Sequence, residues 1–395
     1  MCRTRRWFRS CMDDIRIPFN RPCVVDTSLG FVERALASPI HAGDGTFTNQ
    51  CQTIIEGELG VRKALLTTSC THALEMAALL LDIRPGDEVI VPSFTFVSTA
   101  NAFALRGARI VFADIRQDTL NIDETRVESL FSDRTRAIVP VHYAGVGCEM
   151  DTLTALAAQR GLRQRGVAVV EDNAHGLFGK WCGRPLGSFG VLATQSFHES
   201  KNFSCGEGGA LIVNDPSLLD RAEIVREKGT NRSRFFRGQV DKYSWLELGS
   251  SYLLSDVLAA LLASQLEQRV QIQARRHAIW KRYESELNEW AVVQGVRLPF
   301  VPSEADHTAH MFYLRMPSLD VRQRFIGHLR SRGILAVFHY LPLHLSDVGR
   351  GMGGRPGDCP VAEEVSDRIV RLPLYAALTE DEQDEVIAGV RAFRA

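Results

Sequence analysis

The chain has 395 residues, of which 45% are hydrophobic and 24% are charged, as is usual for a globular protein. Lys and Arg total 46 against 47 Asp and Glu, so the net charge of -1 gives no reason to expect nucleic acid or an anionic membrane as a partner. A chain of this length exceeds the usual size of a single hydrophobic core, which predicts one large and one smaller domain.

The first residues are basic, but no apolar stretch of a secretory signal follows them. We expect residues 1–14 to form a tail, residues 15–265 a large domain and residues 266–395 a small C-terminal domain. A short basic interaction arm is the alternative for the tail.

The apolar runs are too short to span a bilayer. The nine cysteines are scattered, without the spacing of zinc ligands, which predicts reduced thiols, a cytoplasmic location and no metal site.

Short apolar runs alternate with helical periodicity between Val61 and Val213. The expected strands are Ala64 to Thr67, Glu88 to Pro92, Ile110 to Ala113, Ala137 to His142, Val167 to Glu171 and Leu211 to Val213. The expected helices are His72 to Leu81, Thr95 to Leu105 and Thr152 to Gln159. This alternation predicts an α/β fold, a mostly parallel sheet between helices that binds ligands beyond the carboxyl ends of its strands.

Beyond Ala259 a long polar helical stretch leads into an α+β segment. The expected elements are strands at His310 to Met316 and Ala336 to Tyr340, helices at Asp320 to Arg330 and Thr379 to Phe393, and a glycine-rich loop at Gly349 to Asp358.

Small hydroxylated residues follow the first strand, from Thr67 to Thr71. They are typical of a helix N-cap, and the free N–H groups of a helix start also bind anions. An N-cap alone remains the simpler interpretation. The chain has no GxGxxG and no P-loop motif at this point, which disfavours a nicotinamide oxidoreductase.

Two further strand ends carry charged residues. An apolar strand runs into Glu171 and Asp172, and either a helix cap or a carboxylate that pairs with a protonated ring nitrogen explains this acid. Lys201 lies in a tight segment before Gly206, which suits a desolvated amine with a lowered pKa, although for this residue alone a surface lysine is the simpler interpretation. The order of anion-binding helix start, acid and lysine is that of pyridoxal phosphate (PLP) enzymes.

At these residues the sequence resembles the nucleotide-sugar aminotransferases of the DegT/StrS type, which are fold type I PLP enzymes with a mostly parallel sheet and a smaller α+β C-terminal domain. It is most similar to the branch that makes dTDP-4-amino-4,6-dideoxygalactose for surface polysaccharides, including those of the enterobacterial common antigen type. The most specific stretches are Pro92 to Val97, Pro140 to Gly145, Ser196 to Gly209 and Arg226 to Arg232.

The resemblance implies that Lys201 holds the cofactor covalently and that Asp172 pairs with its ring nitrogen. His175 would contact the ring hydroxyl, and Phe96 would stack on the ring. Ser196 and the backbone around Cys70 and Thr71 would bind the phosphate. Many family members have an asparagine at the position of Ser251, reaching the phosphate site of the neighbouring subunit, so that contact is shorter or water-mediated here, or is absent.

The resemblance further implies that L-glutamate is the donor and that dTDP-4-keto-6-deoxy-D-glucose is the acceptor. A nucleotide diphosphate needs positive charge, and Lys228, Arg232 and Arg237 supply it in a segment that also contains Tyr243. A solvated face is the alternative. We expect this segment to cross to the partner's site in a homodimer, and His339 to lie at the rim of the site.

Other functions remain open at this point. They are a transaminase for another keto-sugar nucleotide or a cyclitol, and a PLP-binding regulator without turnover. A sugar dehydratase of the same family has a histidine in place of the lysine, so Lys201 argues against it.

Overall fold

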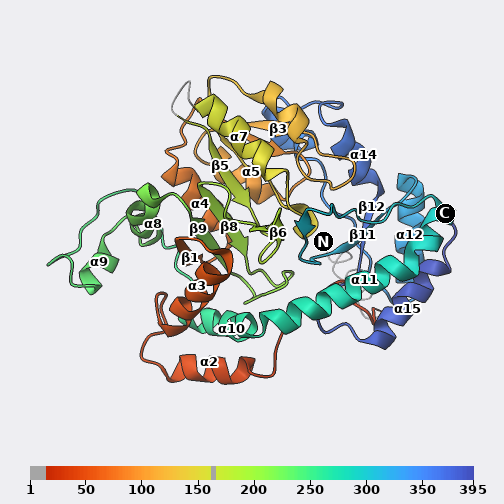
Figure 1. Cartoon of the computed structure of the whole chain (residues 1–395), viewed down its shortest axis with the longest axis horizontal. Helices are drawn as coiled ribbons and strands as arrows, with labels where there is room; N and C mark the ends of the chain where they lie inside the picture. The colour runs from red at the N-terminus through yellow and green to blue at the C-terminus, as the bar shows by residue number, and fades with distance from the viewer. Residues whose placement is uncertain (1–14, 162–165) are drawn as a thin grey trace, which may run out of the picture.

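A computed structural model describes residues 15–161 and 166–395 (Figure 1). Residues 1–14, for which we expect a tail, lie outside the described residues. No helix within these two ranges is both long enough and apolar enough to cross a membrane.

A seven-stranded sheet forms the centre of the structure, with only β9 running against its neighbours. Its strands, in spatial order, are β1 (Lys63–Thr67), β9 (Gly209–Val213), β8 (Leu192–Ser196), β5 (Ala168–Asp172), β4 (Thr135–Ile138), β2 (Glu88–Pro92) and β3 (Arg109–Ala113). The carboxyl ends of β1, β8 and β5 therefore meet at one edge. The mostly parallel α/β fold expected from the sequence is confirmed.

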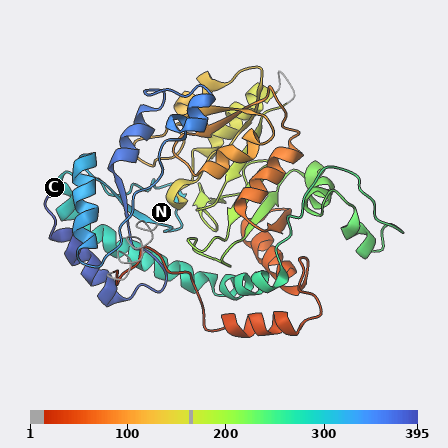
Figure 2. The same cartoon turned by 180° about the vertical axis from the view of Figure 1, so that it is seen from behind.

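Helices cover both faces of this sheet (Figures 1 and 2). One layer comprises α4 (Cys70–Leu80), α5 (Val97–Ala104) and α8 (Leu219–Arg226), and the other α3 (Thr46–Leu59), α7 (Met150–Gly161) and α10 (Asp256–Glu267). Outside these layers lie α2 (Ser28–Ala37), α6 (Glu124–Val127) and α9 (Arg232–Phe236). Successive residues of a strand pack into the cores on opposite faces of the sheet, because side chains alternate along a strand. Leu65 and Leu66 of β1 show this alternation.

The long helix α11 (Arg269–Gln294) leads into a smaller unit, whose two-stranded sheet consists of β11 (Phe312–Arg315) and β12 (Ile369–Leu372). Its remaining helices are α12 (Leu319–Arg330), α13 (Asp347–Gly351), α14 (Pro360–Arg368) and α15 (Glu380–Arg391). A small sheet of β10 (Ala305–Asp306), β6 (Lys180–Trp181) and β7 (Arg184–Pro185) joins segments distant in sequence.

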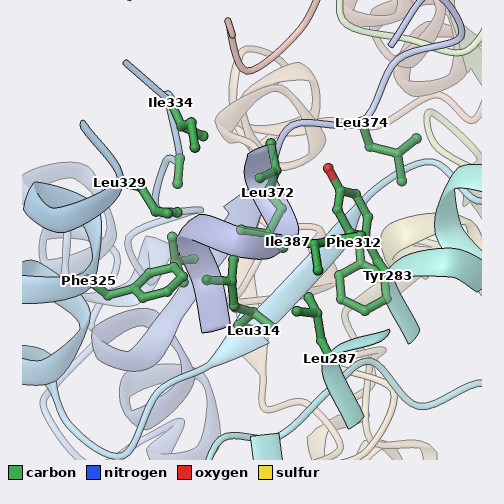
Figure 3. Packing of buried hydrophobic residues seen from close by; sticks show 14 of the residues in the cluster. Tyr283, Leu287, Phe312, Leu314, Phe325, Leu329, Ile334, Leu372, Leu374 and Ile387 are labelled. Carbon is green, nitrogen blue, oxygen red and sulfur yellow. The ribbon is translucent and has the colours of Figure 1, made fainter. Parts of the chain in front are cut away.

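The smaller unit has its own core, in which Tyr283 of α11, Phe312 of β11 and Phe325 of α12 are fully buried (Figure 3). Ile17 also packs into this core, although the sequence groups it with residues 15–265. The division into residues 15–265 and 266–395 therefore stays a proposal.

Three expected elements differ in the structure. The strand at Ala137 to His142 begins earlier and ends at Ile138, because Pro140 has no N–H for a ladder. Ala336 to Tyr340 forms only the single bridge of Val337 to Arg371, and the φ of 29° at Tyr340 is incompatible with a strand. The glycine-rich loop begins inside α13.

Candidate active site

The N-terminus of α4 forms one wall of a cavity beyond the strand ends. Ser69 caps the helix, since its Oγ accepts the N–H of His72 at 3.1 Å. The N–H groups of Cys70 and Thr71 have no intrahelical partner at this position and can bind an anion. Gly209 of β9 passes directly beneath, where a Cβ atom would lie 2.4 Å from the nitrogen of Cys70.

Asp172 ends β5 and is buried. Its Oδ2 accepts a 2.7 Å hydrogen bond from the Thr99 hydroxyl, and its Oδ1 accepts the N–H of Ala174 at 3.2 Å. Burial raises the pKa of Asp172, whereas the bonds from Thr99 and Ala174 oppose that shift. A carboxylate held in this way can pair with a cationic ring nitrogen.

Lys201 lies in the loop between β8 and β9, where its N–H donates to the carbonyl oxygen of His198 at 2.9 Å. Burial lowers the pKa of Lys201 to about 8, despite the opposing effects of Cys70 and Asp172. A substantial fraction of this amine is therefore neutral near physiological pH, the form that attacks an aldehyde.

Three histidines from different segments face the same cavity. The ring of His175 stacks on that of His310, with centroids 4.2 Å apart. A hydrogen bond of 2.8 Å joins Nδ1 of His339 to the hydroxyl of Tyr143. Burial lowers the pKa of all three, so they are neutral at physiological pH. The Nδ1 atom of His175 is buried and has no hydrogen-bond partner among the described residues.

The cavity has a volume of about 530 Å³. It brings together eight of the residues expected at the site: Cys70, Thr71, Phe96, Asp172, His175, Ser196, Lys201 and His339. The Phe96 side chain is 56% exposed, which leaves its ring free to cover a ligand. An acid, an amine whose pKa is lowered, a free helix start and an unpaired imidazole nitrogen match the groups that PLP presents.

The other five expected residues do not line this cavity. Lys228 and Arg232 are both paired with Glu227, and Arg237 is paired with Glu223 at 2.7 Å. These residues belong to the segment from Lys228 to Trp245, in which α9 extends away from the body in both views (Figures 1 and 2). Tyr243 of this segment is exposed, as is Ser251 beyond it.

Thr99 and Arg371 are among the polar residues of the cavity that the sequence interpretation missed. Thr99 lies on α5, and nothing in its local sequence distinguishes it from an ordinary helix residue. Arg371 occupies a strand whose other three residues are buried and apolar, and a charge in such a strand is a signal that the sequence offers.

The comparisons with known proteins agree with this geometry. The model of the DegT/DnrJ/EryC1/StrS aminotransferase family matches residues 24–391. The chain belongs to this family. It is 32% identical over 388 residues to the spore coat polysaccharide biosynthesis protein SpsC of Bacillus subtilis, covering 95% of this chain and 96% of that protein.

Two solved structures are also similar to this chain. A putative sugar aminotransferase from Streptococcus pneumoniae in its PMP form has a TM-score of 0.88 and 26% identity, over 95% of this chain and 98% of the other. DesV of S. venezuelae, in complex with a ketimine intermediate, has a TM-score of 0.84 and 30% identity, over 94% and 98%. This chain is thus a PLP-dependent sugar aminotransferase, as the resemblance implied.

Proposed function

We propose that this aminotransferase moves the amino group of L-glutamate to C4 of dTDP-4-keto-6-deoxy-D-glucose, giving dTDP-4-amino-4,6-dideoxy-D-galactose for surface polysaccharide synthesis. The observation that carries the proposal of amino transfer is the meeting of Lys201 and Asp172 in one cavity, with the pKa of the lysine lowered to about 8. The named sugar rests on the resemblance of the sequence. The polysaccharide role of SpsC supports the wider pathway.

Different residues of the cavity would bind different groups of PLP. Cys70, Thr71 and Ser196 would bind its phosphate, Asp172 its ring nitrogen and His175 its ring hydroxyl. PLP bound in this way supplies an electron sink for the charge that develops when a substrate carbon loses a proton.

Lys201 has two roles in this proposal. Its Nζ holds the cofactor between turnovers, and as a free amine it takes the proton from the α-carbon of the donor. The same nitrogen returns a proton when the amino group is delivered to the keto-sugar. Asp172 would pair with the protonated ring nitrogen, since its hydrogen bonds from Thr99 and Ala174 favour the carboxylate against the effect of burial.

A homodimer completes the site in this proposal. The segment from Lys228 to Trp245 does not line the cavity of its own chain and carries exposed aromatic side chains, among them Tyr243 and Trp245. Arg232, Arg237 and Ser251 would then bind the nucleotide or the phosphate at the partner's cavity, with the cations exchanging their present carboxylate partners for phosphate oxygens.

We also place the protein in the cytoplasm. Seven cysteines lie among the described residues, and all are free thiols. Reduced thiols are typical of that compartment.

Product analysis tests the substrate assignment. The enzyme is incubated with L-glutamate and dTDP-4-keto-6-deoxy-D-glucose, and the amino-sugar is assigned by NMR. An axial amine at C4 is expected. Transfer to the other face of C4, to another carbon, or only to a cyclitol ketone would replace the named acceptor. Absence of transfer to every ketone, with PLP bound, would identify a regulator.

A further inference from the structure

Arg371 lines the cavity, and not all of its N–H groups have a hydrogen-bond partner in the described part of the chain. It lies on β12 between Val370 and Leu372, which are both buried. Its guanidinium lies 4.5 Å from the ring centroid of Phe19, and Nη2 donates to the carbonyl oxygen of Phe338 at 3.1 Å. The Nε atom is buried and has no hydrogen-bond partner in the described part of the chain.

No carboxylate of the described residues forms an ion pair with Arg371. The two acids of the cavity are Asp172 and Glu207, and Asp172 is already bonded to Thr99 and Ala174. Burial lowers the pKa of Arg371, whereas Tyr143 and Tyr340 oppose that shift. The residue as a whole is half-buried, and an anionic ligand stabilises a cation that is partly withdrawn from water without a counter-charge.

We propose that Arg371 binds the α-carboxylate of the amino donor. This inference rests on the proposed function, which brings the α-carbon of an amino acid to Lys201 in the cavity that Arg371 also lines. The proposed keto-sugar has no carboxylate, and the phosphate of the cofactor is assigned to the start of α4. A planar guanidinium with a free Nε binds a carboxylate in two places at once.

Arg371 and Lys201 influence each other electrostatically, since the charge of Arg371 contributes to the lowered pKa of Lys201. A donor carboxylate on Arg371 would offset that effect. A carboxylate bound there would also restrict the orientation of the donor in the cavity.

Binding without turnover tests this role. α-Methyl-L-glutamate has no α-hydrogen and cannot react further, so a titration of the PLP absorption band gives its dissociation constant. Relative to wild type, Arg371→Met should weaken this binding about 30-fold or more, because the donor carboxylate loses its cationic partner in the cavity. Arg371→Lys keeps the positive charge but loses the planar guanidinium with its two parallel donors. This variant should weaken the binding of α-methyl-L-glutamate less than Arg371→Met does. Arg315→Met is the matched control on β11, since Arg315 does not line the cavity.

4-Aminobutanoate, which lacks the α-carboxylate, should bind equally to wild type and to Arg371→Met. Equal weakening of both ligands, or unchanged binding of α-methyl-L-glutamate, would overturn the role. So would a defect confined to the acceptor half-reaction, which would place the carboxylate on the acceptor. If wild type binds neither glutamate nor its methyl analogue but reacts with another amino acid, the proposed donor is wrong, and the α-methyl form of that amino acid then tests Arg371.

Discussion

The hydroxyl of Thr99 donates a 2.7 Å hydrogen bond to Oδ2 of Asp172. This contact links α5 to the end of β5 and lowers the pKa of an acid that burial raises. Thr95 supports it, because its hydroxyl lies 2.9 Å from that of Thr99. Asp172 is therefore held both by α5 and by the backbone that follows β5.

Thr99→Val should slow the L-glutamate half-reaction and move its acid limb to higher pH. Asp172 is more easily protonated once this hydrogen bond is lost, and its protonation as pH falls removes the charge that pairs with the ring nitrogen. A pH profile of single-turnover rates measures the shift. Thr99→Ser keeps the hydroxyl and should resemble wild type; an unchanged profile for valine would show that Thr99 does not tune the acid.

The rate at which the apoprotein captures PLP should rise with pH towards about 8 and level off above it. The pKa of Lys201 is lowered to about 8, and only the neutral amine attacks the aldehyde. Stopped-flow absorbance measures the rate, with Lys201→Ala as the control that forms no covalent band. A rate that keeps rising to pH 10 would mean that the lysine titrates normally.

The variants Lys201→Ala and Asp172→Asn should both bind PLP, but each should slow the L-glutamate half-reaction for a different reason. Removal of the lysine deletes the proton carrier, and general-base assistance is typically worth about 10²–10⁴-fold. The asparagine variant keeps the lysine and should react slowly, because the ring nitrogen is less protonated. Single-turnover kinetics with L-glutamate separate the two. Near wild-type conversion by Lys201→Ala would assign the proton transfer to another residue.

A mixture of Lys201→Ala and Arg237→Ala subunits should recover activity when each variant alone is inactive. Arg237 lies outside its own cavity, so a mixed dimer would contain one intact site. The measurement is the specific activity after subunit exchange. No recovery despite exchange would refute a shared site that depends on Arg237.

Six of the seven strands of the sheet could be predicted, but β8 was not among the expected strands, because its residues Thr194, Gln195 and Ser196 are polar. Buried strands appear in the sequence as apolar runs, and Asp172 was predicted from its position at the end of such a run. The roles of Phe96, His175 and Ser196 were predicted from the resemblance to the family. Arg371 was missed as a site residue because its role depends on how β12 packs against the large domain. The strand expected at Ala336 to Tyr340 failed for a related reason, since the backbone conformation of Tyr340 is determined by tertiary packing beside the cavity.

The central claim is that Lys201 holds PLP and that the enzyme takes an amino group from L-glutamate. The most direct measurement is the absorption spectrum of the purified protein with added PLP, before and after L-glutamate, together with an assay for 2-oxoglutarate. The account predicts a yellow protein that loses its colour on addition of glutamate and releases 2-oxoglutarate in a single turnover. A protein that stays colourless with PLP, or that remains yellow and forms no 2-oxoglutarate, would contradict it.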